Sequence, residues 1–370
     1  MGRSRRWTIV VAAVATLIGL SLLVAARPAP ASGLSAADLR GRVLASAGMP
    51  YSGYAEAVGS LSLPVTTSFS SLTDLLGGRT QLRVWFAGPA QWRVDQLSLV
   101  GESDTYRDHD GTITWDYERS RATFAEVGAD GQVRLPVATD LLPPELGRRL
   151  LSQAQPDELA RIGQQRIAGH AAAGLRLVPR QTGSTITRVE LWVDEASGIP
   201  LKVQVYAGAG SADVSTSFLD FSASPPAERD TAFSTPVGAN LQVERGLDVP
   251  GLVRRFAHGT PPPALAGVAR NDQLGALAGT DRIGVYGRGI TEFIAAPLPD
   301  RLAGSLLSQL EKVPSAVKDA VGIHVAVGPV SLLLATASPT RSAWLLTGSV
   351  TSSLLNTAAA DLPSNDGGNP

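Results

Sequence analysis

The chain has 370 residues, of which 44% are apolar and 18% charged, and it contains no cysteine. This apolar fraction is enough for a folded core, and the length suits two domains. The absence of cysteine excludes disulfides, thiolate metal sites, a cysteine nucleophile and a lipidated N-terminal cysteine. A net charge of −1 argues against a nucleic-acid partner held by bulk positive charge.

The N-terminal segment has the features of an export signal. The basic stretch Met1–Arg6 precedes Trp7–Ala26, which holds no charge and is about long enough to span a bilayer. Ala29–Ala31 adds small residues suited to a cleavage site. Residues 1–31 are therefore predicted to be a cleaved signal peptide or an uncleaved membrane anchor. The rest of the chain is predicted to be extracytoplasmic, either secreted or anchored to the cytoplasmic membrane.

After the leader, the spacing of apolar residues changes from a helical period to a period of two. A short amphipathic helix is expected over 35–47, and beyond it apolar residues recur at every second position. These runs are separated by Gly, Pro and Asp turns, which predicts about seven or eight antiparallel strands between residues 51 and 222. A helix is expected over 143–160, and the runs 187–193 and 201–206 flank a turn and should pair as a hairpin.

Composition divides the chain after this region. Residues 251–263 are Pro-rich and are predicted to be a linker. Beyond them, 264–362 mixes short strand patterns with helices, expected over 300–311 and 352–362, which indicates a small α+β domain. The first domain would then span 32–250, and 363–370 would form a disordered tail.

Four segments, in chain order, resemble motifs of bacterial envelope proteins. They are Asp110–Tyr117, Arg166–Leu177, the hairpin Leu191–Val205, and Phe218–Phe221 followed by Thr231–Gly238. These segments are similar to strands of LolA-type lipoprotein carriers and of the N-terminal domain of the RseB/MucB regulators. The resemblance implies a mainly antiparallel β fold, in which a strongly curved half-barrel sheet carries helices on its concave face.

Each predicted strand offers one apolar set of alternate residues, and some of these sets must line the concave face. We expect that face to hold acyl chains, because each buried CH₂ contributes about 0.8 kcal/mol. Trp85 alternates with the apolar set of its strand, on the side of Gln81 and Arg83, and is expected on the outer surface. The predicted ligand-binding residues are Val84, Phe86, Trp92, Val94, Ile113, Trp115, Tyr117, Leu191 and Val203.

The sequence shows no catalytic constellation. The four histidines, at 109, 170, 258 and 324, are scattered and lack the spacing of metal ligands. A nucleophile elbow is absent, and the glycine-rich run Gly284–Gly289 lacks the lysine of a phosphate-binding loop. We therefore predict no enzymatic activity, no metal and no cofactor.

Two functions remain as hypotheses. The first is an exported envelope protein that carries a lipid, or the acyl chains of a lipoprotein, in the half-barrel cavity. The alternative, implied by the RseB/MucB resemblance, is a regulator that binds the extracytoplasmic part of a membrane anti-sigma factor.

Overall fold

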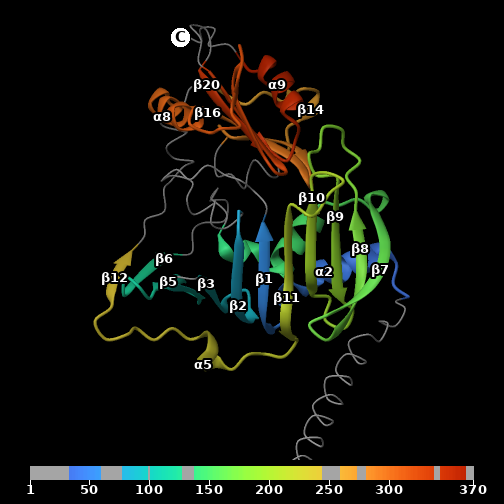
Figure 1. Cartoon of the computed structure of the whole chain (residues 1–370), viewed down its shortest axis with the longest axis vertical. Helices are drawn as coiled ribbons and strands as arrows, with labels where there is room; N and C mark the ends of the chain where they lie inside the picture. Colours follow the sequence, from blue (N-terminus) through green and yellow to red (C-terminus); the bar gives the residue numbers. More distant parts are fainter. Residues whose placement is uncertain are drawn as a thin grey trace, which may run out of the picture.

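The computed structural model describes residues 33–59, 77–98, 101–126, 137–243, 259–272, 281–336 and 342–363. Two large β-sheets and several helices make up this part of the chain (Figure 1). The predicted leader, most of the linker and nearly all of the tail lie outside the described residues. Among the helices of the described residues, none is long and apolar enough to cross a membrane.

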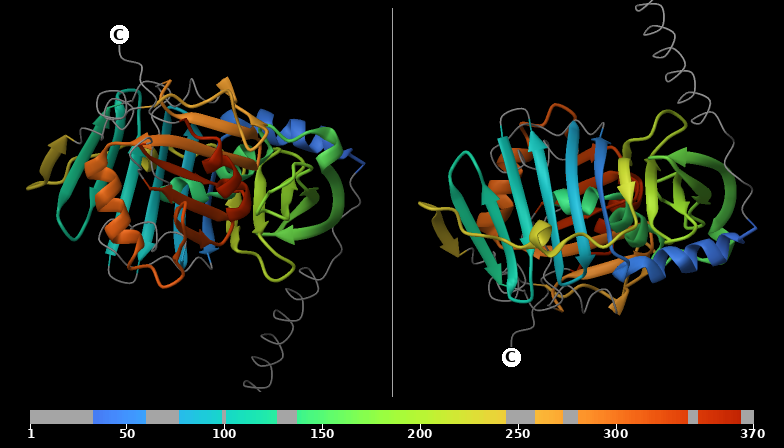
Figure 2. Two further views of the ribbon diagram at one scale, coloured as in Figure 1. Left: turned by 90° about the horizontal axis from the view of Figure 1, so that it is seen from above. Right: turned by 90° about the horizontal axis from the view of Figure 1, so that it is seen from below.

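The larger sheet has twelve strands in the order β12-β6-β5-β4-β3-β2-β1-β11-β10-β9-β8-β7. It is strongly curved but does not close into a barrel (Figure 2). All neighbouring strands are antiparallel except β12, which runs parallel to β6. The strands are β1 (Tyr51–Gly59), β2 (Arg79–Gly88), β3 (Gln91–Ser98), β4 (Gly101–Arg107), β5 (Gly111–Asp116), β6 (Arg121–Glu126), β7 (Leu159–Ile167), β8 (His170–Leu177), β9 (Arg188–Asp194), β10 (Pro200–Tyr206), β11 (Val214–Ser222) and β12 (Asn240–Val243).

Helices cover one face of this sheet, which we call the helix face. Helix α2 (Ala36–Ala45) begins at Ser35, whose hydroxyl accepts a hydrogen bond from the Asp38 amide, and it is followed by the short η1 (Ser46–Gly48). Helix α4 (Pro143–Leu151) follows the short η2 (Ala138–Leu141) and lies on the side that faces the smaller sheet (Figures 1 and 2). The curved, mainly antiparallel sheet with helices on one face confirms the predicted fold class.

The helix expected over 143–160 is shorter than the sequence pattern suggested. It ends at Leu151, and after the turn η3 (Pro156–Glu158) the chain enters β7. Proline lacks the N–H that a helix interior needs, and the residues from Leu159 onward instead pair with β8. The predicted hairpin of β9 and β10 is confirmed.

The opposite face of the sheet is crossed by a long connection, which we call the strap (residues 223–239). It leaves β11, forms the single turn α5 (Glu228–Thr231), and ends at the edge strand β12 (Figure 2). The Phe233 ring meets the Tyr106 ring edge-on at 5.1 Å between centroids, and the Gln91 amide donates to the Thr231 hydroxyl at 3.0 Å. The strap thus buries part of the second face, which we call the strap face.

Beneath the strap lies a buried ion cluster. Asp95 and Asp104 stand opposite each other on β3 and β4, and neither is exposed. The Arg93 guanidinium donates to both carboxylates, at 2.5 and 3.0 Å to Asp95 and 2.8 Å to Asp104. It also lies 5.0 Å from the ring centroids of both Trp85 and Tyr106. Burial raises the pKa of both carboxyls above the ordinary aspartate value.

The smaller sheet has six strands in the order β15-β16-β20-β19-β18-β17. Helix α9 (Ser352–Ala360) covers one face, where Trp344 and Leu346 are buried, and α8 (Asp300–Leu310) covers the other, over Ile323 and Leu334. The strands are β15 (Gly284–Arg288), β16 (Thr291–Leu298), β17 (Val317–Lys318), β18 (Gly322–Val327), β19 (Val330–Ala335) and β20 (Ala343–Gly348).

The described end of the predicted linker is bound to this smaller sheet. The Tyr286 hydroxyl donates to the Pro262 carbonyl at 2.7 Å, and the Arg270 guanidinium donates to the Pro261 carbonyl at 2.9 Å. A two-stranded hairpin, β13 (Ala264–Leu265) and β14 (Val268–Ala269), follows directly.

The ion cluster yields a first prediction. Replacing Arg93 with Ala should lower the free energy of unfolding by about 3–5 kcal/mol, because two buried carboxylates lose their counter-charge. The matched control is Arg79→Ala, which removes an exposed ion pair with Glu56 and should cost less than about 1 kcal/mol. Chemical denaturation measures both. Equal losses in the two variants would contradict a special role for the cluster.

Candidate functional site

The strand register places six of the nine predicted ligand-binding residues on the helix face. Val84 pairs with Val94, and Phe86 pairs with Trp92, across β2 and β3. Leu191 and Val203 pair across β9 and β10. The register continues from Val203 through Thr216, Ala57 and Thr80 to β2, so all six side chains share one side of the sheet.

The remaining three predicted residues lie on the strap face. Val94 pairs with Thr105, and Thr105 pairs with Thr114, so the neighbouring residues Ile113 and Trp115 of β5, and Tyr117 beyond its end, point the other way. The expectation that Trp115 and Trp92 share a face is therefore wrong, whereas Trp85 does lie on the side opposite Trp92. Alternation fixes the faces within one strand, but the phase between strands depends on turns that carry no such signal.

The chain's own residues fill much of the apolar part of the helix face. Val84 is 1% exposed and lies in one cluster with Leu141 and Leu142. Leu191 and Val203 are fully buried in a second cluster, together with helix residues that include Leu151. The apolar surface that the sequence pattern assigned to a ligand is thus largely covered by the protein's own helices.

On β4 to β6 the helix face is polar. Thr105, Thr114 and Thr123 lie side by side in register, and all three are half-buried. An acyl chain gains little from hydroxyl-bearing surface, because burying an unpaired hydroxyl is unfavourable. The helix face therefore offers an acyl ligand much less apolar surface than the sequence pattern suggested.

The two large sheets meet at a junction formed by two loops. The loop between β8 and β9 pairs with the chain after β20: the Thr185 amide donates to the Ser349 carbonyl at 3.1 Å, and the Thr351 amide donates to the Gly183 carbonyl at 2.8 Å. The β15–β16 turn reaches the other way, and its Ile290 joins the second apolar cluster of the larger sheet.

A bidentate ion pair joins the sheets beside this turn. The Arg288 guanidinium donates to both oxygens of Glu158, at 3.0 and 3.1 Å. The Gln155 and Arg180 amides donate to the same carboxylate, at 2.8 and 3.2 Å. Burial alone would raise the pKa of Glu158, but these donors outweigh it and hold the pKa below its usual value.

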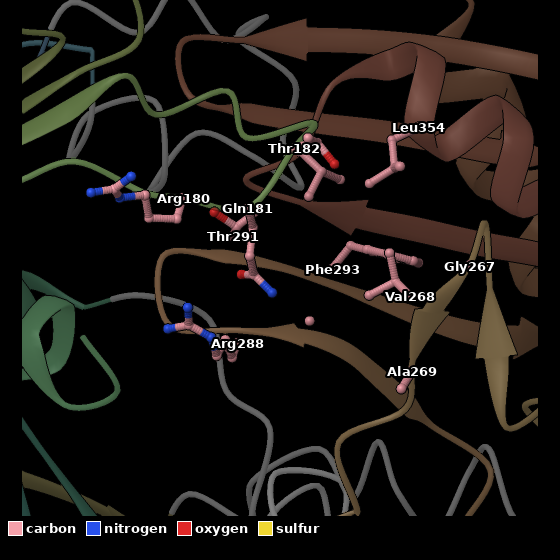
Figure 3. A pocket seen from close by; sticks show the side chains of 12 residues that line it. Arg180, Gln181, Thr182, Gly267, Val268, Ala269, Arg288, Thr291, Phe293 and Leu354 are labelled. Carbon is pink, nitrogen blue, oxygen red and sulfur yellow. The ribbon is translucent and has the colours of Figure 1, made fainter. Parts of the chain in front are cut away.

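A pocket of about 520 Å³ opens between the two loops. Figure 3 shows two unlike ends: the guanidinium groups of Arg180 and Arg288 lie at one, and Val268, Phe293 and Leu354 lie at the other. The remaining lining residues are Gln181, Thr182, Gly267, Ala269, Gly287, Thr291 and Val350. Its volume is within the usual range for ligand sites, so this junction pocket is the candidate functional site.

A second carboxyl, that of Glu292, lies close to the junction. Its Oε1 is buried and has no hydrogen-bond partner among the described residues. Burial raises its pKa to about 7, although the Gly289 amide and the Arg149 charge of α4 act in the opposite direction. Buried carboxyls with raised pKa values in a cleft are frequent at functional sites.

Comparison with known proteins finds a family model that matches the middle of the chain. Residues 132–233 match the MucB/RseB N-terminal domain. This segment is similar to members of the MucB/RseB family. It contains α4 and β7 to β11, and it contributes Glu158 and the Arg180 side of the pocket. The resemblance read from the sequence motifs is therefore confirmed. No curated protein matches the chain.

The chain also matches solved structures at low sequence identity. The MucA/MucB complex of Pseudomonas aeruginosa is 16% identical, with a TM-score of 0.49, over 88% of this chain and 96% of that chain. A LolA superfamily protein from Nitrosomonas europaea is 10% identical, with a TM-score of 0.24, over 54% of this chain and 99% of that chain.

Sequence reasoning missed the junction pocket. Its residues come from the β8–β9 loop, β14, the β15–β16 hairpin, the end of β20 and α9, and no motif connects them. The only partial signal was the run Gly284–Gly289, which holds Gly287 and Arg288. In the structure two of its glycines serve the β15–β16 turn, where Gly287 and Gly289 adopt φ values of +90° and +65°.

Glu292 gives a prediction about pH. Because its pKa is raised in the folded protein, its contribution to stability is complete below the ordinary glutamate value of 4.5 and is lost as the pH rises through about 7. Glu292→Gln should remove this decline, so the free energy of unfolding should fall less between pH 5 and 8 than in the wild type. Urea denaturation across this range tests it, and parallel pH profiles for the two proteins would refute it.

Proposed function

We propose that the protein is an extracytoplasmic regulator that binds a polypeptide partner, namely the extracytoplasmic segment of a membrane anti-sigma factor. The observation that carries the proposal is the family match over residues 132–233, which includes the loop on one side of the junction pocket. A structure of a similar protein is described as MucB in complex with MucA(peri). The pocket between the sheets is the place where we expect the partner segment to bind.

The filling of the helix face also favours a protein partner over a lipid cargo. A carrier of acyl chains needs an apolar cavity, but Val84, Leu191 and Val203 are covered by the chain's own leucines. Binding lipid there would require η2 and α4 to leave the sheet and expose Leu141, Leu142 and Leu151 to water. Each such leucine would cost roughly 1.5–3 kcal/mol. A polypeptide at the junction needs no such opening.

The proposal agrees with the absence of a catalytic constellation in the sequence. In this reading the protein is non-enzymatic and acts by binding alone. Export through the N-terminal segment would bring it to the compartment where the extracytoplasmic part of a membrane anti-sigma factor lies.

The test is a binding experiment with one blocked variant. The purified full chain should bind the extracytoplasmic domain of an anti-sigma factor from the same organism, as measured by calorimetry. Ala269 is exposed and lines the pocket, so Ala269→Trp should fill the pocket and weaken binding at least about tenfold, which corresponds to about 1.4 kcal/mol.

The matched control is Ala223→Trp. Ala223 is also exposed, but it lies in the strap and is not among the pocket residues. It should bind like the wild type. Failure of every extracytoplasmic anti-sigma domain of the organism to bind, together with co-purified lipid in native mass spectrometry, would favour the carrier hypothesis instead.

A further inference from the structure

The two ends of the junction pocket differ in chemistry, and this difference restricts what can bind. At the polar end, Glu158 accepts hydrogen bonds from two backbone amides and from the Arg288 guanidinium. Its carboxylate is therefore fully used in neutralising Arg288 and in closing the η3 turn. It has no capacity left to neutralise a second cation.

Arg180 supplies that second cation. Its guanidinium donates to the Asp157 backbone carbonyl at 3.0 and 3.2 Å, and the nearest carboxylate oxygen described, on Asp157, is 3.8 Å away. Both side chains of this ion pair are about two-thirds exposed, at 66% and 67%, so the attraction is weak. The polar end therefore keeps positive charge available for an anionic group of a ligand.

The middle of the pocket requires a hydrogen-bonding partner. The Thr291 hydroxyl oxygen is buried and has no partner among the described residues, and the residue is only 4% exposed. Gln181 projects its amide into the space between Thr291 and Arg288 (Figure 3). Buried polar groups are normally hydrogen-bonded, and the C=O and N–H groups of a peptide can provide such bonds whereas an acyl chain cannot.

The far end is apolar. Phe293 and Val350 are almost fully buried, at 1% each, and Val268 and Leu354 are half-buried beside them. The accessible part of this wall, on Val268 and Leu354, offers a bulky aliphatic or aromatic side chain a surface to cover, which is favourable in proportion to the apolar area removed from water.

We propose that the junction pocket recognises an extended peptide segment in which an acidic residue stands next to a bulky apolar residue. The carboxylate lies against Arg180, a backbone group of the peptide pairs with the Thr291 hydroxyl, and the apolar side chain covers Val268 and Leu354. This assignment rests on the proposed function, because it specifies the chemistry of the segment that the partner inserts.

Short peptides test this chemistry without the partner. The probe is acetyl-Gly-Asp-Leu-Gly-amide, and its analogues replace Asp with Asn or Leu with Gly. Ligand-observed NMR with the full chain should show saturable binding of the probe, with either analogue about threefold to fivefold weaker. Equal binding of all three peptides would overturn the proposal.

Two pairs of variants locate the binding. Arg180→Ala should abolish the difference between the Asp and Asn peptides, whereas Arg229→Ala, at an arginine side chain that is 88% exposed on the strap, should preserve it. Thr291→Val should weaken the probe about fivefold. Thr216→Val removes another buried hydroxyl without a partner, far from the pocket in β11, and should have no effect.

The outcomes separate this inference from the proposed function. If the anti-sigma domain binds the wild type but the peptides bind Arg180→Ala and the wild type alike, the pocket chemistry is wrong and the regulatory function stands. If the peptides behave as expected but no anti-sigma domain binds, the pocket assignment stands and the partner is of another kind. Saturable binding of decanoate that is lost in Thr291→Val, with no response to the peptides, would replace the peptide by a fatty acid.

Discussion

The pairing of β3, β4 and β5 decides what each side of the larger sheet can do. Because Val94, Thr105 and Thr114 stand in one row, the helix face changes from apolar to hydroxyl-bearing within two strands. Arg93, Asp95, Asp104, Tyr106 and Trp115 are consequently placed on the strap face. A shift of one residue in this register would exchange the two faces.

The sheet therefore has two buried faces, and each is stabilised differently. The helix face is held by leucines of η2, α2 and α4, which is mainly a hydrophobic contribution. The strap face is held by Arg93 between two aromatic rings and two buried carboxylates. The ligand atoms of Asp95, Glu102 and Asp104 lie within 4.8 Å of one another, but two of these carboxylates already have the guanidinium as their cation. We accordingly regard this cluster as structural.

Because both faces are covered by the protein's own residues, the best-supported ligand site lies at the edge of the larger sheet, where its loops meet the smaller sheet. The Glu158–Arg288 ion pair and the Thr185 and Thr351 backbone bonds fix the two sheets on either side of a pocket. A ligand in this pocket would touch residues of both sheets, so its binding would couple their relative positions. A regulator that responds to a partner needs such coupling, whereas a lipid carrier needs an openable apolar cavity.

The sequence alone determined the kinds of elements and much of the fold class. Alternating runs such as Leu201–Tyr206, the capped helix after Ser35 and four motifs in order were enough to indicate a curved antiparallel sheet with helices, because these signals are local. The family match over residues 132–233 confirmed the resemblance. The position of Trp115 was not predictable, since alternation within β5 says nothing about its phase relative to β3. The junction pocket was not predictable either, because Arg180, Thr291 and Leu354 are brought together only when the two sheets dock. The burial and the unpaired hydrogen-bonding groups that define the site exist only in the folded chain.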